Sequence, residues 1–89
     1  MATPSFYRDD EDNEIDLILE FTGLGRIFAI EFKVDENETV RPGFWRACEA
    51  MQATDRWLVH SGSKEQLERD PRRLSLLAAL ELIRQEAKV

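Results

Sequence analysis

Three side chains on two neighbouring predicted strands have the types and the spacing to carry metal-assisted chemistry. Asp16 lies in one alternating segment of the chain, and Glu31 and Lys33 lie in the next. Carboxylate oxygens are preferred ligands of Mg²⁺ and Mn²⁺, and a bound cation lowers the pKa of its water. A lysine beside such a site adds positive charge and orients the water. We therefore predict a site with Asp16 and Glu31 as metal ligands, with Asp16, Glu31 and Lys33 as catalytic residues, and with Glu14 in support.

A β-hairpin is the element that would position these side chains. Residues 14–21 and 26–33 alternate between apolar and polar side chains, and Thr22–Gly25 supplies turn residues between them. Slipping the pairing by one residue would move the apolar side chains to the wrong face, so the pattern itself favours a single register. In that register one face of the hairpin carries Ile15, Leu17, Leu19, Phe21, Phe28, Ile30 and Phe32.

The same register brings the acidic side chains together on the other face. Asp16 is predicted to lie directly opposite Glu31, and Glu14 opposite Lys33. Directly opposed side chains have Cβ atoms about 4.5–5.5 Å apart. Two carboxylates at that range repel each other, and a cation between them would reverse the sign of the interaction.

The segment after the hairpin predicts a crossover to a third strand. Pro42 suits the first position of a helix over residues 42–53, and residues 56–60 form a short β-prone run. A strand, a helix and a strand of these lengths make a right-handed crossover, which places the third strand parallel to the second. We expect the helix to cover the face that carries Phe28, Ile30 and Phe32.

The two ends of the chain complete the expected architecture. Ser63–Gln66 has capping-box form and predicts a short helix, and residues 72–87 carry a broad apolar stripe typical of a longer one. Residues 1–13 are expected to be a flexible lead-in with a candidate short strand at Phe6–Arg8, and residues 14–89 a single domain. The predicted fold class is α/β, with a small mixed sheet of an antiparallel hairpin plus a parallel third strand, flanked by helices.

Composition narrows the functional classes. The chain has 89 residues, a net charge of −6 and a single cysteine, Cys48. An acidic balance counts against a dedicated nucleic-acid-binding protein, and one cysteine with one histidine, His60, makes no zinc site. No apolar run is long enough to span a membrane, and the first residues do not form a secretory signal. We expect a cytoplasmic protein without a membrane partner, with Cys48 packed in the core.

Three short motifs carry a resemblance to a known superfamily. Phe6-Tyr7-Arg8, the strand Glu14–Glu20 and the sequence Ile30-Glu31-Phe32-Lys33 resemble the PD-(D/E)xK nuclease-like superfamily. The resemblance is strongest to the C-terminal domain of unknown function found on many prokaryotic AAA-type ATPases. It is best over residues 6–33 and extends to about residue 62.

The resemblance implies a restriction-endonuclease-like core that lacks the first helix. It also implies Mg²⁺-dependent phosphodiester hydrolysis of DNA, with Asp16 and Glu31 as the metal-binding acids and Lys33 as the lysine that positions the attacking water. The partners it implies are DNA and either a second copy of the chain or an ATPase module. The sequence leaves open whether the domain is an enzyme, and the alternative is a non-catalytic interaction or regulatory module.

Overall fold

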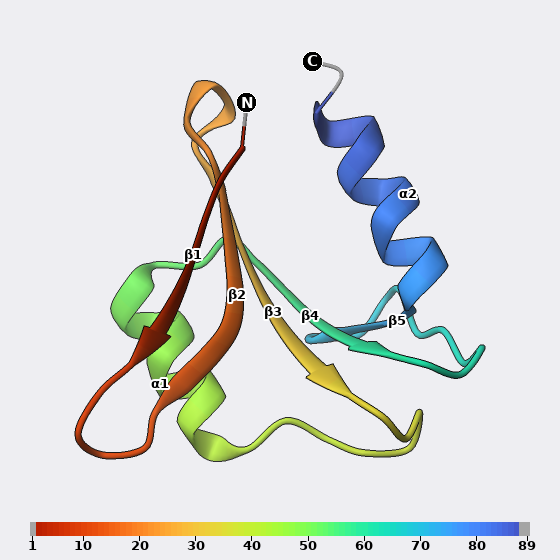
Figure 1. Cartoon of the computed structure of the whole chain (residues 1–89), viewed down its shortest axis with the longest axis horizontal. Helices are drawn as coiled ribbons and strands as arrows, with labels where there is room; N and C mark the ends of the chain where they lie inside the picture. The colour runs from red at the N-terminus through yellow and green to blue at the C-terminus, as the bar shows by residue number, and fades with distance from the viewer. Residues whose placement is uncertain (1, 88–89) are drawn as a thin grey trace.

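The chain forms a five-stranded mixed sheet with two helices in the computed structural model, which describes residues 2–87 (Figure 1). The strands lie in sequence order across the sheet, with β1, β2 and β3 antiparallel and β3, β4 and β5 parallel. The predicted α/β class and mixed sheet are therefore confirmed, and two further strands enlarge the sheet. The elements are β1 (Ala2–Arg8), β2 (Glu14–Phe21), β3 (Arg26–Lys33), α1 (Pro42–Met51), β4 (Asp55–His60), β5 (Arg72–Ser75) and α2 (Leu76–Ala87).

The hairpin of β2 and β3 has the predicted bounds and register. Phe21 pairs with Arg26, and Leu17 pairs with Ile30. A single 3₁₀ turn at Thr22–Leu24 connects the strands, and Gly25 ends it with a φ of 64°. Glycine adopts this left-handed conformation without steric cost, which explains its place in the turn.

The strand β1 is longer than the sequence predicted. It covers Ala2–Arg8 and pairs with β2 along its length, whereas only Phe6–Arg8 was expected to add a strand. Most of its side chains are exposed, so it has no apolar alternation to signal a strand. As an edge strand it also tolerates Pro4, which has no N–H to donate.

A bulge in β2 corrects the predicted faces of the hairpin. Ser5 pairs with Ile18 and Tyr7 pairs with Ile15, so two steps along β1 match three along β2. The extra residue turns Ile15 to the same side as Ile18, and both are buried together with Ala29. The prediction that Ile15 shares a face with Leu17 was therefore wrong, because strict alternation does not anticipate a bulge.

The crossover from β3 through α1 to β4 is confirmed, but α1 covers the other face of the sheet. Phe44, Ala47 and Cys48 of α1 pack against Ile15, Ile18 and Ala29 and not against Phe28 and Ile30. Apolar side chains occur on both faces of the sheet, so composition could not choose between them. The handedness of the crossover decides the face that the helix covers.

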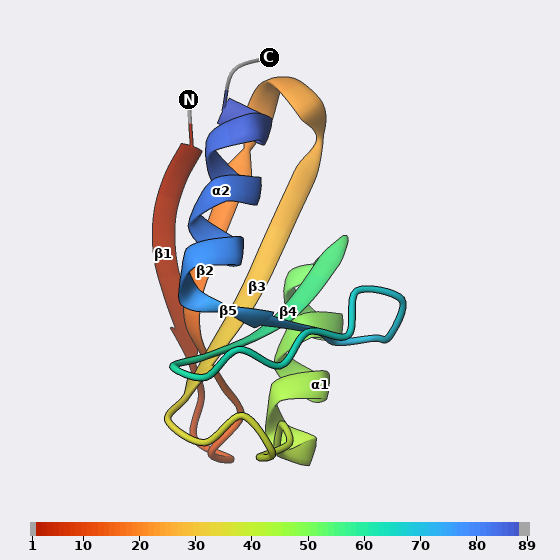
Figure 2. The same ribbon diagram turned by 90° about the vertical axis from the view of Figure 1, so that its right-hand side faces the viewer.

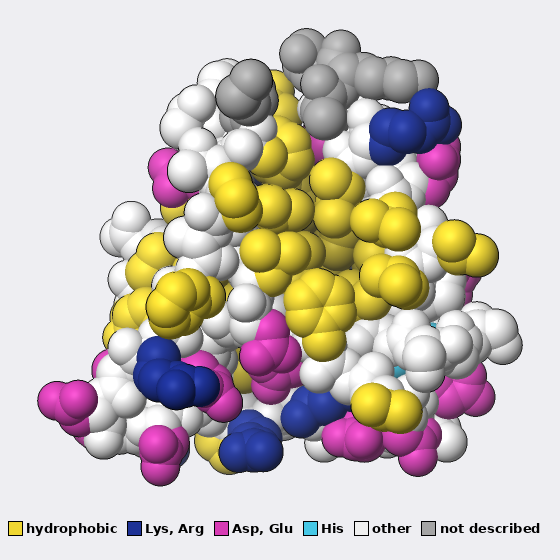
Figure 3. Space-filling view, viewed as in Figure 1, with side chains coloured by type: hydrophobic (Ala, Val, Ile, Leu, Met, Phe, Trp, Pro, Cys, Tyr) yellow, Lys and Arg dark blue, Asp and Glu magenta, His cyan; other side chains and the backbone are white. Residues whose placement is uncertain are grey.

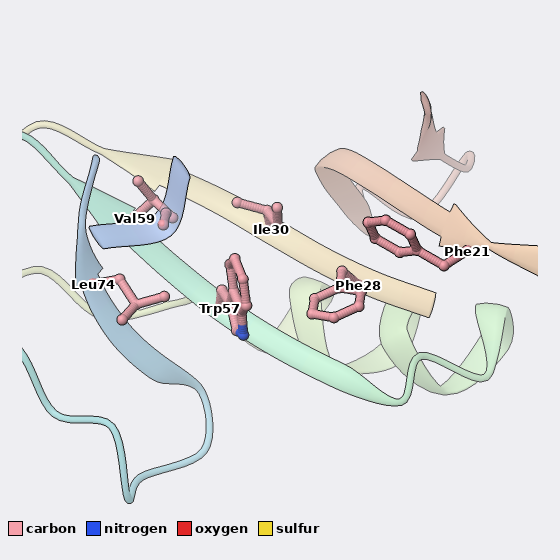
Figure 4. Close-up of a cluster of buried hydrophobic side chains, with 7 residues drawn as sticks. Phe21, Phe28, Ile30, Trp57, Val59 and Leu74 are labelled. Carbon is pink, nitrogen blue, oxygen red and sulfur yellow. The ribbon is translucent and has the colours of Figure 1, made fainter. Parts of the chain in front are cut away.

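The second face of the sheet holds the larger aromatic core, and α2 covers part of it. Phe28 packs edge-to-face on Phe21 and Trp57, with ring centroids 5.3 and 5.0 Å apart (Figure 4). Ala79 of α2 closes this cluster, with Leu82 and Ile83 packed against it. Figure 2 shows the two helices on different sides of the strands.

Two helix predictions near the C-terminus require correction. Residues 72–75 form β5 and the helix begins only at Leu76, where the Ser75 hydroxyl accepts a hydrogen bond from the Ala78 N–H (3.2 Å). Residues 63–66 form no helix, because the Glu36 carboxylate accepts the N–H groups of Ser63 and Lys64 (3.0 and 3.1 Å). Contacts from a distant loop thus satisfy the donors that a capping box would have used.

Neither helix in the described part of the chain has the length and apolar character to cross a membrane.

Candidate functional site

A polar hollow of about 210 Å³ lies between the start of α1 and the two hairpin strands. The strand β2 contributes Glu14 and Asp16, β3 contributes Glu31 and Lys33, and Arg41 lies just before α1. The structure therefore brings all four sequence-predicted site residues to one hollow. The charged residues that line it are Asp12, Glu14, Asp16, Glu31, Lys33 and Arg41.

The acid pair lies one step beyond the last pairing of the β2–β3 ladder, which is Leu17 with Ile30. Beyond that pair a side chain replaces the backbone acceptor, because Asp16 Oδ2 accepts a hydrogen bond from the Phe32 N–H (2.9 Å). Asp16 is exposed to solvent, whereas Glu31 is only 6% exposed. The two carboxylates therefore meet at the wall of the hollow in different environments.

The environment of Glu31 disfavours a negative charge. Burial raises the pKa of its carboxyl group to about 7, and the neighbouring Asp16 carboxylate adds to this shift. The Lys33 ammonium acts in the opposite direction, and its Nζ lies 4.0 Å from Glu31 Oε2. Desolvation of the charged form is thus the main cause, and one lysine at this distance does not offset it.

Lys33 is held between two acids, one of which the sequence did not single out. Its Nζ lies 3.8 Å from Glu38 Oε2 as well as 4.0 Å from Glu31 Oε2. Arg73 of β5 fixes the loop that carries Glu38, because its Nη1 donates to the carbonyl oxygens of Glu36 and Glu38 (both 2.6 Å). Nothing in the local pattern of the acidic run at residues 35–38 distinguishes Glu38 from its neighbours.

Glu14 does not face Lys33 as the regular register predicted. Its carboxylate pairs with Arg8 of β1, with Oε2 3.1 Å from Nη2 and 3.2 Å from Nε. The bulge in β2 falls between Ile15 and Ile18, at the end of the β2–β3 ladder. The regular register therefore does not extend to Glu14. Glu14 still lines the hollow, where it adds negative charge beside Asp16.

Gly43 allows α1 to begin against the loop at residues 9–13. A Cβ at this position would lie 2.9 Å from the Asp12 carbonyl oxygen and 3.2 Å from Asn13 Cα. Asp9 organises the same loop, since its carboxylate accepts the N–H groups of Glu11 and Asn13 (2.9 and 3.1 Å). The start of α1 is thereby brought to the rim of the hollow.

The donor set of the hollow suits a hard cation only if other oxygens complete the coordination. Among residues 2–87, no group of three or more His, Cys, Asp or Glu side chains is arranged to hold a metal ion. Mg²⁺ keeps several waters and is often bound by one or two carboxylates plus substrate phosphates. The Asp16 and Glu31 carboxylates fit that pattern, and the hollow leaves room for water and phosphate oxygens.

His60 and Cys48 have structural roles. The Nδ1 of His60 accepts the Gly62 N–H (3.0 Å), so Nε2 carries the proton and donates to the Lys64 carbonyl oxygen (2.6 Å). Cys48 is packed in the α1 core, and burial raises the pKa of its thiol to about 12. Neither side chain is available as a soft metal ligand.

Comparison with known proteins gives a family without an assigned activity. The family model of a domain of unknown function, DUF4143, matches residues 1–80. No curated protein and no solved structure is significantly similar to the chain.

Proposed function

We propose that this chain, which belongs to the DUF4143 family, is a metal-binding, PD-(D/E)xK nuclease-like domain that hydrolyses phosphodiester bonds of DNA. The cation is Mg²⁺ or Mn²⁺, its protein ligands are Asp16 and Glu31, and Lys33 is the third catalytic residue. The observation that carries the proposal is the buried Glu31 carboxyl group beside a second carboxylate in an open polar hollow.

A bound cation accounts for an arrangement that is otherwise unfavourable. Burying a carboxylate costs free energy, and placing it beside another carboxylate adds repulsion. A buried carboxyl group with a raised pKa beside a second carboxylate is often found at a functional site. A divalent cation between Asp16 and Glu31 would turn the repulsion into attraction and restore the charged form of Glu31.

The chain connectivity supports the same proposal. The structure has an antiparallel hairpin, a crossover helix and a parallel strand, and these are the elements that the resemblance implies for a nuclease-like core without its first helix. The acid on β2 and the Glu-x-Lys motif on β3 reach one hollow because of this arrangement. The structure also adds the start of α1 to the same rim.

In this proposal each group in the hollow has a separate role in hydrolysis. A bound cation would supply Lewis acidity, which activates water and offsets charge on the phosphate. Lys33, with Nζ 4.0 Å from Glu31 Oε2, orients the attacking water. Arg41 and the positive end of the α1 helix dipole lie at the same hollow and would favour a phosphate there.

Titration with Mn²⁺ tests metal binding directly. We expect NMR signals of residues around Asp16 and Glu31 to broaden selectively, and Mg²⁺ to raise the melting temperature. A ligand at about 100 times its dissociation constant stabilises the folded state by about 2.7 kcal/mol. The combined Asp16→Asn and Glu31→Gln variant should lose both effects, whereas Glu20→Gln, on the same strand as Asp16, should keep them. Equal effects in all three proteins would refute the site.

A second candidate function is suggested by exposed apolar side chains on the α2 side of the sheet. Leu76, Leu77 and Leu80 of α2 are 49%, 80% and 54% exposed. Phe32, near the end of β3, and Val34, just after it, are 46% and 82% exposed. Figure 3 shows a broad group of hydrophobic side chains on this face. A non-catalytic interaction module would use such a surface.

Self-association is the expected consequence of this apolar face. Sedimentation equilibrium at increasing concentration should give an average mass above the 10.4 kDa of one chain. Leu80→Glu should shift the protein toward the monomer, because it places a charge within the face. Leu67→Glu, an exposed leucine outside α2, serves as the control. A strictly monomeric protein at about 100 µM would remove association of the isolated chain from consideration, since an interface of functional size would be populated there.

A further inference from the structure

Two adjoining hollows near the start of β4 form a second polar surface. One has a volume of about 160 Å³ and is lined by Trp57, Arg69 and Arg72, among others. The other has a volume of about 230 Å³ and is lined by Trp45 and again by Arg69. They share Arg69 and Asp70, so the two hollows adjoin at this segment.

The carboxylates around these hollows are already neutralised by other arginines. Asp70 accepts hydrogen bonds from Arg56 Nε (3.0 Å) and Nη2 (2.7 Å). Asp55 is paired with Arg26, at 2.9 Å between Oδ1 and Nη2. Because both carboxylates are paired, any further basic side chain here adds a net positive charge.

Arg73 already donates to the Glu36 and Glu38 carbonyl oxygens, so the basic side chains that remain are Arg69 and Arg72. Both are exposed, and neither has a carboxylate within 4.0 Å in the part of the chain that the structure describes. A chain with a net charge of −6 therefore presents a local positive surface at this place. Two guanidinium groups at one hollow suit a phosphate, which they can contact with several N–H groups.

The indole of Trp57 supplies an independent sign of a missing hydrogen-bond acceptor. Trp57 is 2% exposed, and its Nε1–H is a buried donor without a hydrogen-bond partner. Buried donors are nearly always paired, so an unpaired one calls for a specific explanation. Trp57 pairs with Arg72 across β4 and β5, and it lines the same hollow. Figure 4 shows the indole nitrogen at the end of the ring away from Ile30 and Val59.

Trp45 offers an aromatic surface in the adjoining hollow. Its side chain is on α1, the residue is 38% exposed, and the guanidinium carbon of Arg56 lies 5.8 Å from its ring centroid. A partly exposed aromatic ring beside arginines is the combination on which nucleic-acid bases stack. The surface thus combines donors for a phosphate with a ring for a base.

We propose that the two hollows bind a nucleotide, either free or within a single strand of nucleic acid. Its phosphate contacts Arg69, Arg72 and the Trp57 indole N–H, and its base stacks on Trp45. This binding uses none of the residues of the acidic hollow and requires no divalent cation. It gives the domain a means of holding nucleic acid despite its acidic overall charge.

The two tryptophans make the test specific, because they give two indole N–H signals in a ¹H–¹⁵N spectrum. Trp45→Phe assigns the signals. In the absence of divalent cations, inorganic phosphate should move the Trp57 indole signal, and adenosine monophosphate should move both signals. A single-stranded oligonucleotide that binds more tightly than the mononucleotide identifies a strand as the ligand, and one that binds no more tightly identifies the free nucleotide.

Charge removal decides whether the proposed arginines hold the ligand. The Arg69→Gln and Arg72→Gln double variant should bind the mononucleotide at least about tenfold more weakly, as expected for loss of charge-assisted hydrogen bonds. Arg84→Gln, an exposed arginine on α2, should leave the affinity within about twofold for a surface charge far from the ligand. The spectra themselves report that each variant is folded. If the indole signals do not respond to the mononucleotide, or if the double variant binds it normally, the proposal is wrong.

Discussion

Replacing Glu31 with glutamine is expected to stabilise the folded protein by roughly 2–3 kcal/mol near pH 8, and by almost nothing near pH 4. The pKa of Glu31 is raised from 4.5 to about 7 in the folded state, chiefly by burial. The folded protein therefore holds a proton between these pH values that the unfolded chain releases. The contribution of the Glu31 proton to stability is fully present below pH 4.5 and is lost as the pH rises through about 7.

Urea unfolding across this pH range measures the effect. The wild-type protein should lose stability between about pH 4.5 and 7, and Glu31→Gln should flatten that part of the profile, since it cannot ionise. Glu20→Gln makes the same chemical change at an exposed position on β2 and should follow the wild-type profile. If Glu31→Gln changes stability equally at all pH values, its charge is not the cause.

The hairpin and its register could be predicted because their determinants are local. A period of two in the apolar residues and a glycine-containing turn fix which residues pair, and Leu17 lies opposite Ile30 as expected. The same pattern places Asp16 and Glu31 together at the end of the ladder. The proximity of the two acids therefore follows from the sequence, although Asp16 lies within the bulge that pairing with β1 defines.

The features that the sequence did not predict depend on contacts between distant segments. The strand β5 has only one buried side chain, Leu74, so its four residues carry no readable alternation. The bulge that turns Ile15 toward α1 is defined by pairing with an exposed edge strand. Within the site, Glu38 reaches Lys33 only because Arg73 of β5 holds its loop. Such residues become recognisable once the tertiary structure is known.

Substitution of the site residues should separate stability from activity. With Mg²⁺ or Mn²⁺ present, Glu31→Gln and Lys33→Ala are each expected to lower DNA cleavage by about 100-fold or more. The first removes a negative ligand charge, and the second removes the ammonium group 4.0 Å from it. Glu20→Gln, purified in the same way, should cleave like the wild type. Cleavage that persists in both site variants would come from another nuclease and would leave the interaction module as the function.

The combination of these outcomes is more informative than either alone. Replacing a buried residue that serves only the fold should lower the stability of the protein. Replacing a catalytic acid in an unfavourable environment should raise stability and lower activity. Glu31→Gln is predicted to do both, because burial makes the charged form of Glu31 unfavourable without a cation and the same carboxylate is the proposed ligand. Lys33→Ala should instead lower stability, since it removes the ammonium group that partly offsets the charge of Glu31. Opposite signs for stability in two variants that both lose cleavage would therefore assign the acidic hollow to catalysis.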